Sequence, residues 1–286
     1  MSSSNTSAPA ERVAILRWIA GIGAVTAGAL AQREGLTVSS ARGRLAAAAR
    51  DGLLARQHPL TAQPTLYTIT RAGLRASGTV GVQPCRVSNA NAQHLIACAG
   101  VAAGLERCYP DHRVLGERDL RRRERERGAP LASARMGSGP GGEQLLHRPD
   151  LVLWPQEGDA GLPVAVEVEL AVKAPRRLAA ICRAWARCRE IAGVLYLAAP
   201  EAERALVRAI EQTDAGARIL VVPLAALGGA HLSASALRGS PCPDAARLQV
   251  APRGIGVTDE HRVCVRARGA SATAALTPPH LLGSHV

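Results

Sequence analysis

The sequence predicts an α/β protein, α+β when taken as a whole, that is built from two units. Helical patterns, a hairpin pattern and a further helix follow one another closely in residues 11–80. In residues 91–228, short apolar runs alternate with amphipathic segments, which is the order of a mixed sheet flanked by helices. The chain has 286 residues, 47% of them hydrophobic, and can therefore supply a core to each unit.

The remaining segments lack this periodicity. Residues 1–10 are rich in serine and are expected to be disordered, and residues 81–90 are expected to be a linker. Residues 229–286 are rich in Gly, Ala, Ser, Pro and Arg, so we expect a low-complexity, largely irregular tail. Within that tail, only residues 248–251 and 262–265 have the pattern of short strands.

The charge of the chain favours a polyanionic partner. Thirty-five basic and 23 acidic residues give a formal net charge of +12. Because neutralising phosphates releases counterions, nucleic acid and an anionic membrane face are the partners to consider. No apolar run reaches the ~18 residues that a membrane span needs, so we expect a soluble protein and no membrane partner. Double-stranded DNA is the partner that the resemblance described below implies.

The cysteines indicate a reducing compartment. There are 7, scattered and without a CxxC pair, which matches neither a disulfide framework nor a zinc site. We therefore predict a cytoplasmic protein. Residues 18–31 follow Arg17 and end in Ala-Leu-Ala, so they also resemble a secretory signal, but the interpretation of the same residues as two helices is preferred.

The elements of the first unit follow from its turn and cap residues. The predicted order is a helix over 11–20 that breaks at 21–23, a helix from Thr26 to Glu34 that stops at Gly35, a helix from Ser39 to Asp51, hairpin strands over 54–58 and 65–69, and a helix capped by Thr70.

Two phrases in this unit, AARDGLLARQ and LYTITRAGLRA, resemble the exits of the recognition helix and of the wing in winged helix-turn-helix proteins. The resemblance covers about a quarter of the chain and implies a third helix in the major groove with the wing along the backbone. The expected base-edge contacts are Ser39, Ser40, Arg42 and Arg44, and the expected phosphate contacts are Arg50, Arg56 and His58. The alternative is a dimerisation or docking module. Winged helices often dimerise, so a homodimer is also considered.

The most informative segment of the second unit is residues 164–173. Side chains alternate along a strand, so Glu167, Glu169 and Lys173 are expected on one face. Asp150, in the phrase HRPD, begins the neighbouring predicted strand. We expect Asp150, Glu167 and Glu169 to bind a hard divalent cation, Mg²⁺ or Mn²⁺, that activates water on a phosphodiester, with Lys173 stabilising the developing charge.

The phrases RPDLVLW and VAVEVELAVK resemble the PD-(D/E)xK motif of the restriction-endonuclease-like fold. The resemblance implies that Asp150 and Glu167 are the two acids of a magnesium-dependent DNA nuclease or nickase. Glu169 stands where the family has lysine. Lys173, the sole lysine of the chain, would lie ~13 Å beyond Glu169 on a straight strand and reaches the site only if the chain bends.

The two units together resemble actinobacterial plasmid replication-relaxation proteins, through the phrases HRPD and EVEL. Two functions therefore remain open: a nuclease directed to DNA by the winged helix, and a catalytically inactive DNA-binding regulator or plasmid replication or mobilisation factor. A solvated, half-exposed strand at 164–173 is the non-functional alternative.

Other residues receive weaker assignments. Residues 113–121 are expected to form a strand that carries Glu117 as a further acid, and residues 121–142 an exposed loop. His94, His112 and His147 are expected to be solvated or structural rather than ligands.

Overall fold

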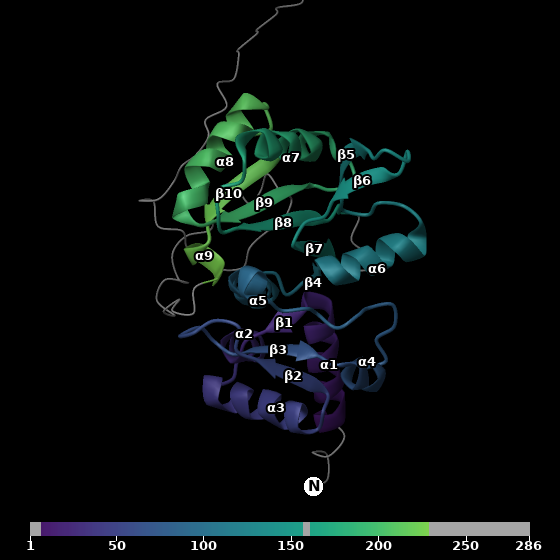
Figure 1. The fold of residues 1–286 in the computed structure, drawn as a ribbon, viewed down its shortest axis with the longest axis vertical. Coiled ribbons are helices and arrows are strands. Elements are labelled where there is room, and N and C mark those ends of the chain that lie inside the picture. Colours follow the sequence, from purple (N-terminus) through teal and green to yellow (C-terminus); the bar gives the residue numbers. More distant parts are fainter. Residues whose placement is uncertain (1–6, 157–160, 229–286) are drawn as a thin grey trace, which may run out of the picture.

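The computed structural model describes residues 7–156 and 161–228, which form a mixed α/β fold (Figure 1). The two predicted strands at 248–251 and 262–265 lie outside the described residues, as does the rest of the tail. Among the helices of the described part, none is long and apolar enough to cross a membrane.

The N-terminal part is a small helical unit with a three-stranded antiparallel sheet. Its elements are α1 (Ser7–Ile22), β1 (Ala24–Val25), α2 (Ala27–Glu34), α3 (Val38–Arg50), β2 (Leu54–Gln57), β3 (Leu66–Ile69) and α4 (Arg71–Ala76). The strand order is β1-β3-β2. Helix α1 begins at Ser7, so residues 7–10 are helical where disorder was expected.

Side-chain caps set most of these boundaries. The Thr26 hydroxyl accepts a hydrogen bond from the Ala29 N–H, and Gly35 ends α2 with a φ of 66° that favours glycine. Thr70 caps α4 as predicted. Helix α3 is capped by Thr37 rather than Ser39, because the Thr37 hydroxyl accepts from the Ser40 N–H at 3.1 Å.

The C-terminal part is built on a five-stranded sheet of order β10-β9-β8-β7-β4. Strands β8, β9 and β10 are parallel, and β7 and β4 are antiparallel to their neighbours. The elements are α5 (Asn89–Cys108), β4 (His112–Gly116), α6 (Glu117–Arg127), β5 (Ala134–Ser138), β6 (Gln144–His147), β7 (Leu151–Pro155), β8 (Val164–Glu169), α7 (Pro175–Arg187), β9 (Gly193–Ala198), α8 (Pro200–Gln212), β10 (Ile219–Pro223) and α9 (Ala225–Gly228).

Helices cover both faces of this sheet (Figure 1). Helices α7 and α8 lie on one face, where Trp185 and Leu206 pack against Ala165 and Tyr196 of the strands. Helix α5 lies on the other face. Every residue of β8 is buried, so the alternative of a half-exposed strand does not hold for residues 164–169. Residues 171 and 172, which follow the strand, are exposed.

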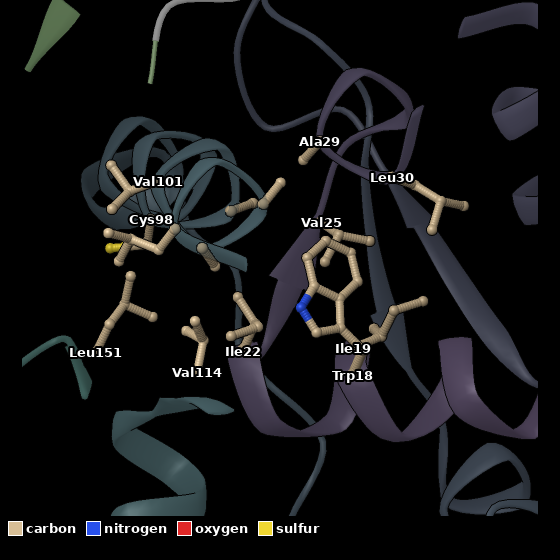
Figure 2. Packing of buried hydrophobic residues seen from close by; sticks show 14 of the residues in the cluster. Trp18, Ile19, Ile22, Val25, Ala29, Leu30, Cys98, Val101, Val114 and Leu151 are labelled. Atoms are coloured by element: carbon tan, nitrogen blue, oxygen red, sulfur yellow. The ribbon is translucent and has the colours of Figure 1, made fainter. Parts of the chain in front are cut away.

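Helix α5 also joins the two parts of the chain. One apolar cluster contains Ile19 and Leu30 of the N-terminal part together with Val101 of α5 and Leu151 of β7. Figure 2 shows these four side chains among the residues of this cluster, which come from both parts of the chain. The segment 81–90 therefore connects two parts that share a core.

The charged run after β4 is a helix, not a strand and a loop. Leu120 and Glu124 of α6 are buried, and Arg122 pairs with Glu126 one turn away. Acidic residues in the first turn and basic residues in the last match the helix dipole. Residues 134–147 then form the β5-β6 hairpin where an exposed loop was expected over much of the segment. The burial of Leu120 and Glu124 gives the charged run of α6 an inner face, whereas in the hairpin strands only Ala134 is buried.

The junction between the two parts requires glycine at position 116. A Cβ there would overlap the Gly21 carbonyl oxygen and come within 3.0 Å of the Ile22 Cα, both in α1. Backbone atoms cannot move aside as a flexible side chain can, so α1 can approach β4 this closely only because Gly116 has no side chain.

We expect Gly116→Ala to lower the free energy of unfolding by about 1–3 kcal/mol, because it overpacks this contact. The matched control is Gly43→Ala on exposed α3, where an added Cβ meets nothing within 4 Å and should stabilise by about 0.5–1 kcal/mol. Urea denaturation measures both, and equal effects of the two substitutions would contradict the packing argument.

Candidate functional site

The first candidate surface lies on α3 and the hairpin. Ser39, Ser40 and Arg42 are exposed in the first half of α3, which has no acidic residue in its first turn. Arg50 at the end of α3 and Arg56 on β2 are also exposed. These side chains present hydroxyl groups and guanidinium groups to the solvent on one side of the N-terminal part.

Two residues predicted for this surface have partners within the chain. Arg44 forms an ion pair with Glu11 of α1 and is half-buried. His58, beyond the end of β2, is exposed, and its Nδ1 lies 3.2 Å from the Thr65 hydroxyl across the hairpin loop. Arg44 thus ties α3 to α1, which reduces its availability to a ligand.

The second candidate site lies where β7 begins and β8 ends. Asp150 precedes β7, and its Oδ2 accepts a hydrogen bond of 2.8 Å from the Val168 N–H. Its Oδ1 lies 3.0 Å from His94 Nε2 on α5. Asp150 is therefore anchored to the backbone of β8 between Glu167 and Glu169 and directed toward α5.

Glu167 is buried on the opposite side of the sheet, toward α7. Its Oε1 lies 2.7 Å from Nε2 of His147, whose ring packs edge-on against Trp185 with 5.6 Å between centroids. Burial raises the pKa of Glu167, and the charge of Asp150 raises it further, while the hydrogen bond from His147 acts to lower it.

The chain bends directly after β8. Lys173 turns back and forms an ion pair with Glu169, which is 6% exposed. The bend that the sequence argument required is therefore present. It brings the Lys173 ammonium to the carboxylate of Glu169, the residue that stands at the motif's lysine position.

The predicted cation ligands do not gather into one group. Asp150 approaches α5 while Glu167 and Glu169 point toward α7, because alternate residues of β8 face opposite layers. Among the described residues, the three-ligand group whose donor atoms all lie within 4.8 Å of one another is His94, Cys98 and Asp150. This set contains a nitrogen and a thiol, which do not suit Mg²⁺, and Asp150, Glu167 and Glu169 are not such a group among the described residues.

His94 and His147, expected to be solvated or structural, each form a hydrogen bond with a carboxylate. His94 and Cys98 are one helical turn apart on α5, and a His-x₃-Cys spacing with an apolar surround was the available signal. His147 stands in the phrase HRPD, three residues before Asp150. Glu117, considered as a further acid, instead pairs with Arg121 in α6.

The protonation of this region follows from its burial and its pairs. The hydrogen bond to Asp150 raises the pKa of His94, although burial acts to lower it. Burial acts to lower the pKa of His147 too, but its hydrogen bond and attraction to Glu167 outweigh this effect and raise it. Burial raises the pKa of the Cys98 thiol well above its ordinary value, so the thiol is neutral at pH 7.

The comparisons with known proteins found no relative. No family model, curated protein or solved structure matches the chain. Functional inference therefore depends on the geometry of the two candidate sites.

The raised pKa of His147 gives a stability prediction with a definite sign. A histidine whose folded pKa is raised stabilises the fold fully below its unfolded pKa of about 6.5, and this contribution is lost as the pH rises through the folded value. In EDTA, the free energy of unfolding should therefore fall above about pH 6.5. His147→Gln, which retains a neutral donor for Glu167, should show a smaller fall.

The matched control is His58→Gln, which alters an exposed histidine. It should follow the wild-type pH dependence in the same denaturation series. The free energy of unfolding of both variants could instead fall as steeply as that of the wild type above about pH 6.5. In that case, the His147–Glu167 pair is not the source of the pH dependence of stability.

Proposed function

We propose that this chain is a double-stranded DNA-binding protein whose N-terminal part is a winged helix. The order α1, β1, α2, α3, β2, β3 with the sheet order β1-β3-β2 supports this proposal. In such a unit, α3 enters the major groove and the loop between β2 and β3 lies on the phosphate backbone.

The observation that carries the proposal is the unpaired basic surface on α3 and β2. Among the ion pairs of the described residues, none involves Arg42, Arg50 or Arg56, and all three are exposed. Helix α3 also lies on the side of the N-terminal part that faces away from the five-stranded sheet (Figure 1). A duplex can thus approach α3 without meeting the C-terminal part.

The chemistry of α3 favours DNA over a protein-docking role. A docking helix usually presents a contiguous apolar patch, whereas the exposed first half of α3 carries Ser39, Ser40 and Arg42 with one exposed apolar residue, Val38. Hydroxyl and guanidinium groups match base edges and phosphates. The net charge of +12 adds long-range attraction to a polyanion.

We expect Arg42→Ala to weaken DNA binding about tenfold or more, since one direct arginine contact contributes about 1–3 kcal/mol. Fluorescence anisotropy with a mixture of genomic fragments, repeated at several salt concentrations, measures the loss. Arg204→Ala on α8 is the matched control, because it removes the same charge from an exposed helix of the C-terminal part. An equal loss of DNA affinity in the two variants would contradict the assignment of α3 to the DNA interface.

A second candidate function is phosphodiester cleavage by the C-terminal part. Asp150 accepts a hydrogen bond from the Val168 N–H, the next residue after Glu167 on β8, and Lys173 folds back to pair with Glu169. The correspondence of Asp150 and Glu167 to the two acids of the nuclease motif is what favours a nuclease-like role. The pairing of Lys173 with Glu169, and of Glu167 with His147, favours instead a regulator or a plasmid replication or mobilisation factor that binds without cutting.

Incubation with supercoiled and linear DNA in Mg²⁺ or Mn²⁺ separates the two functions. Because the partner-bound carboxylates do not gather as cation ligands, we expect binding without cleavage by the wild type and by Glu167→Gln alike. Nicked or linear product that requires metal and disappears in Glu167→Gln would establish the nuclease instead. Arg42→Ala should reduce any such product in proportion to its loss of binding.

A further inference from the structure

We propose that His94, Cys98 and Asp150 bind one transition-metal ion of the zinc class, with a fourth coordination position open to solvent. This site differs from the magnesium site that the motif implied in both its ligands and its metal. It does not depend on DNA binding, because its residues lie on α5 and at the start of β7.

The donor atoms already lie near tetrahedral spacing. His94 Nε2 is 3.0 Å from Asp150 Oδ1 and 3.4 Å from Cys98 Sγ. A tetrahedral zinc ion with ordinary bond lengths separates nitrogen from oxygen by about 3.3 Å and nitrogen from sulfur by about 3.6 Å. The two distances from His94 Nε2 therefore differ from these values by a few tenths of an ångström, and all three donor atoms lie within 4.8 Å of one another.

The ligands are held in place before any ion binds. His94 and Cys98 are separated by one turn of α5 and so project from the same side of that helix. Asp150 is fixed through its other oxygen, Oδ2, by the Val168 N–H, and its carbonyl accepts from the Glu117 N–H. This leaves Oδ1 directed at His94, as a ligand supported by a second hydrogen bond should be.

The donor chemistry selects the class of metal. A thiolate, an imidazole and a carboxylate together suit zinc and similar divalent ions, whereas magnesium and calcium prefer oxygen alone. The same contacts do not suit a cysteine nucleophile with a histidine base oriented by an acid. Such a relay uses both ring nitrogens, but Cys98 and Asp150 both approach Nε2 of His94.

Exposure differs across the site and defines its open side. Cys98 is 6% exposed, whereas the side chains of His94 and Asp150 are 38% and 21% exposed. An ion would thus be bound with its thiolate ligand inward and its free position toward solvent, as in zinc sites that keep a water. Binding would release the thiol proton of Cys98.

A bound metal ion would also cross-link α5 to the residue that directly precedes β7. Helix α5 packs against both the N-terminal part and the sheet, so the ion would stabilise the junction of the two parts in addition to occupying the site. Because the ion binds the folded chain, stability should rise with metal concentration.

Cobalt is the probe that tests the thiolate ligand directly. We expect Co²⁺, added to the reduced full-length protein, to give one thiolate-to-cobalt charge-transfer band in the near ultraviolet with a stoichiometry of one per chain. Cys98→Ser should abolish the band, and His94→Gln should weaken metal binding at least about tenfold. Cys108→Ser, a buried thiol on the same helix, should retain the wild-type band.

Thermal unfolding with and without Zn²⁺ provides the second measurement. Zinc should raise the Tm of the wild type and of Cys108→Ser, and should raise the Tm of His94→Gln less at the same zinc concentration. His94 is partly exposed, so this variant tests the site even if Cys98→Ser does not fold. The proposal would be overturned by a wild type without the charge-transfer band, or by a His94→Gln variant whose cobalt affinity and zinc-induced Tm shift equal those of the wild type. The three residues would then form a hydrogen-bonded cluster only. DNA affinity, measured separately, reports only on α3.

Discussion

Burial of helix α5 on two sides is the constraint on which the rest of this structure depends. A helix that is apolar around most of its circumference must find partners on more than one face. Here the partners are α2 and β1 of the N-terminal part and strands β4, β7 and β8 of the sheet. Its many alanine and glycine residues, such as Ala99, Ala102 and Gly104, permit close approach on both sides.

This burial fixes which polar groups meet at the end of the sheet. His94 and Cys98 lie in the N-terminal half of α5, so they are brought to Asp150 only because α5 packs across β7. On the other layer, His147 and Trp185 enclose Glu167. The Asp150–His94 and Glu167–His147 pairs thus lie toward different layers, although the motif implied that Asp150 and Glu167 share one site.

Charge is balanced locally throughout this region. Glu167 pairs with His147, Glu169 with Lys173, and Asp150 with His94. Leaving any of these carboxylates ionised and unpaired in a buried environment would be costly. The surface of α3 has the opposite character, because Arg42, Arg50 and Arg56 are solvated and unpaired among the described residues. This contrast is consistent with the two different ligands that we propose, DNA at α3 and a metal ion at the cluster of His94, Cys98 and Asp150.

Local signals in the chain determined most helices and strands. Helix caps and apolar runs depend only on neighbouring residues, so the elements that they define were predictable. Examples are the caps Thr26, Gly35 and Thr70 and the apolar runs at residues 151–155 and 193–198. Tertiary structure decided that residues 117–127 form a helix, since the burial of Leu120 and Glu124 gives this charged segment a buried face. It also decided the candidate site, although Asp150 and the acids of β8 were identifiable from the motif. The meeting of His94 and Cys98 with Asp150 depends on contacts between residues 50 or more positions apart. The bend that brings Lys173 to Glu169 depends on a turn without a local sequence signature. Such contacts arise from packing, which no short stretch of sequence encodes by itself.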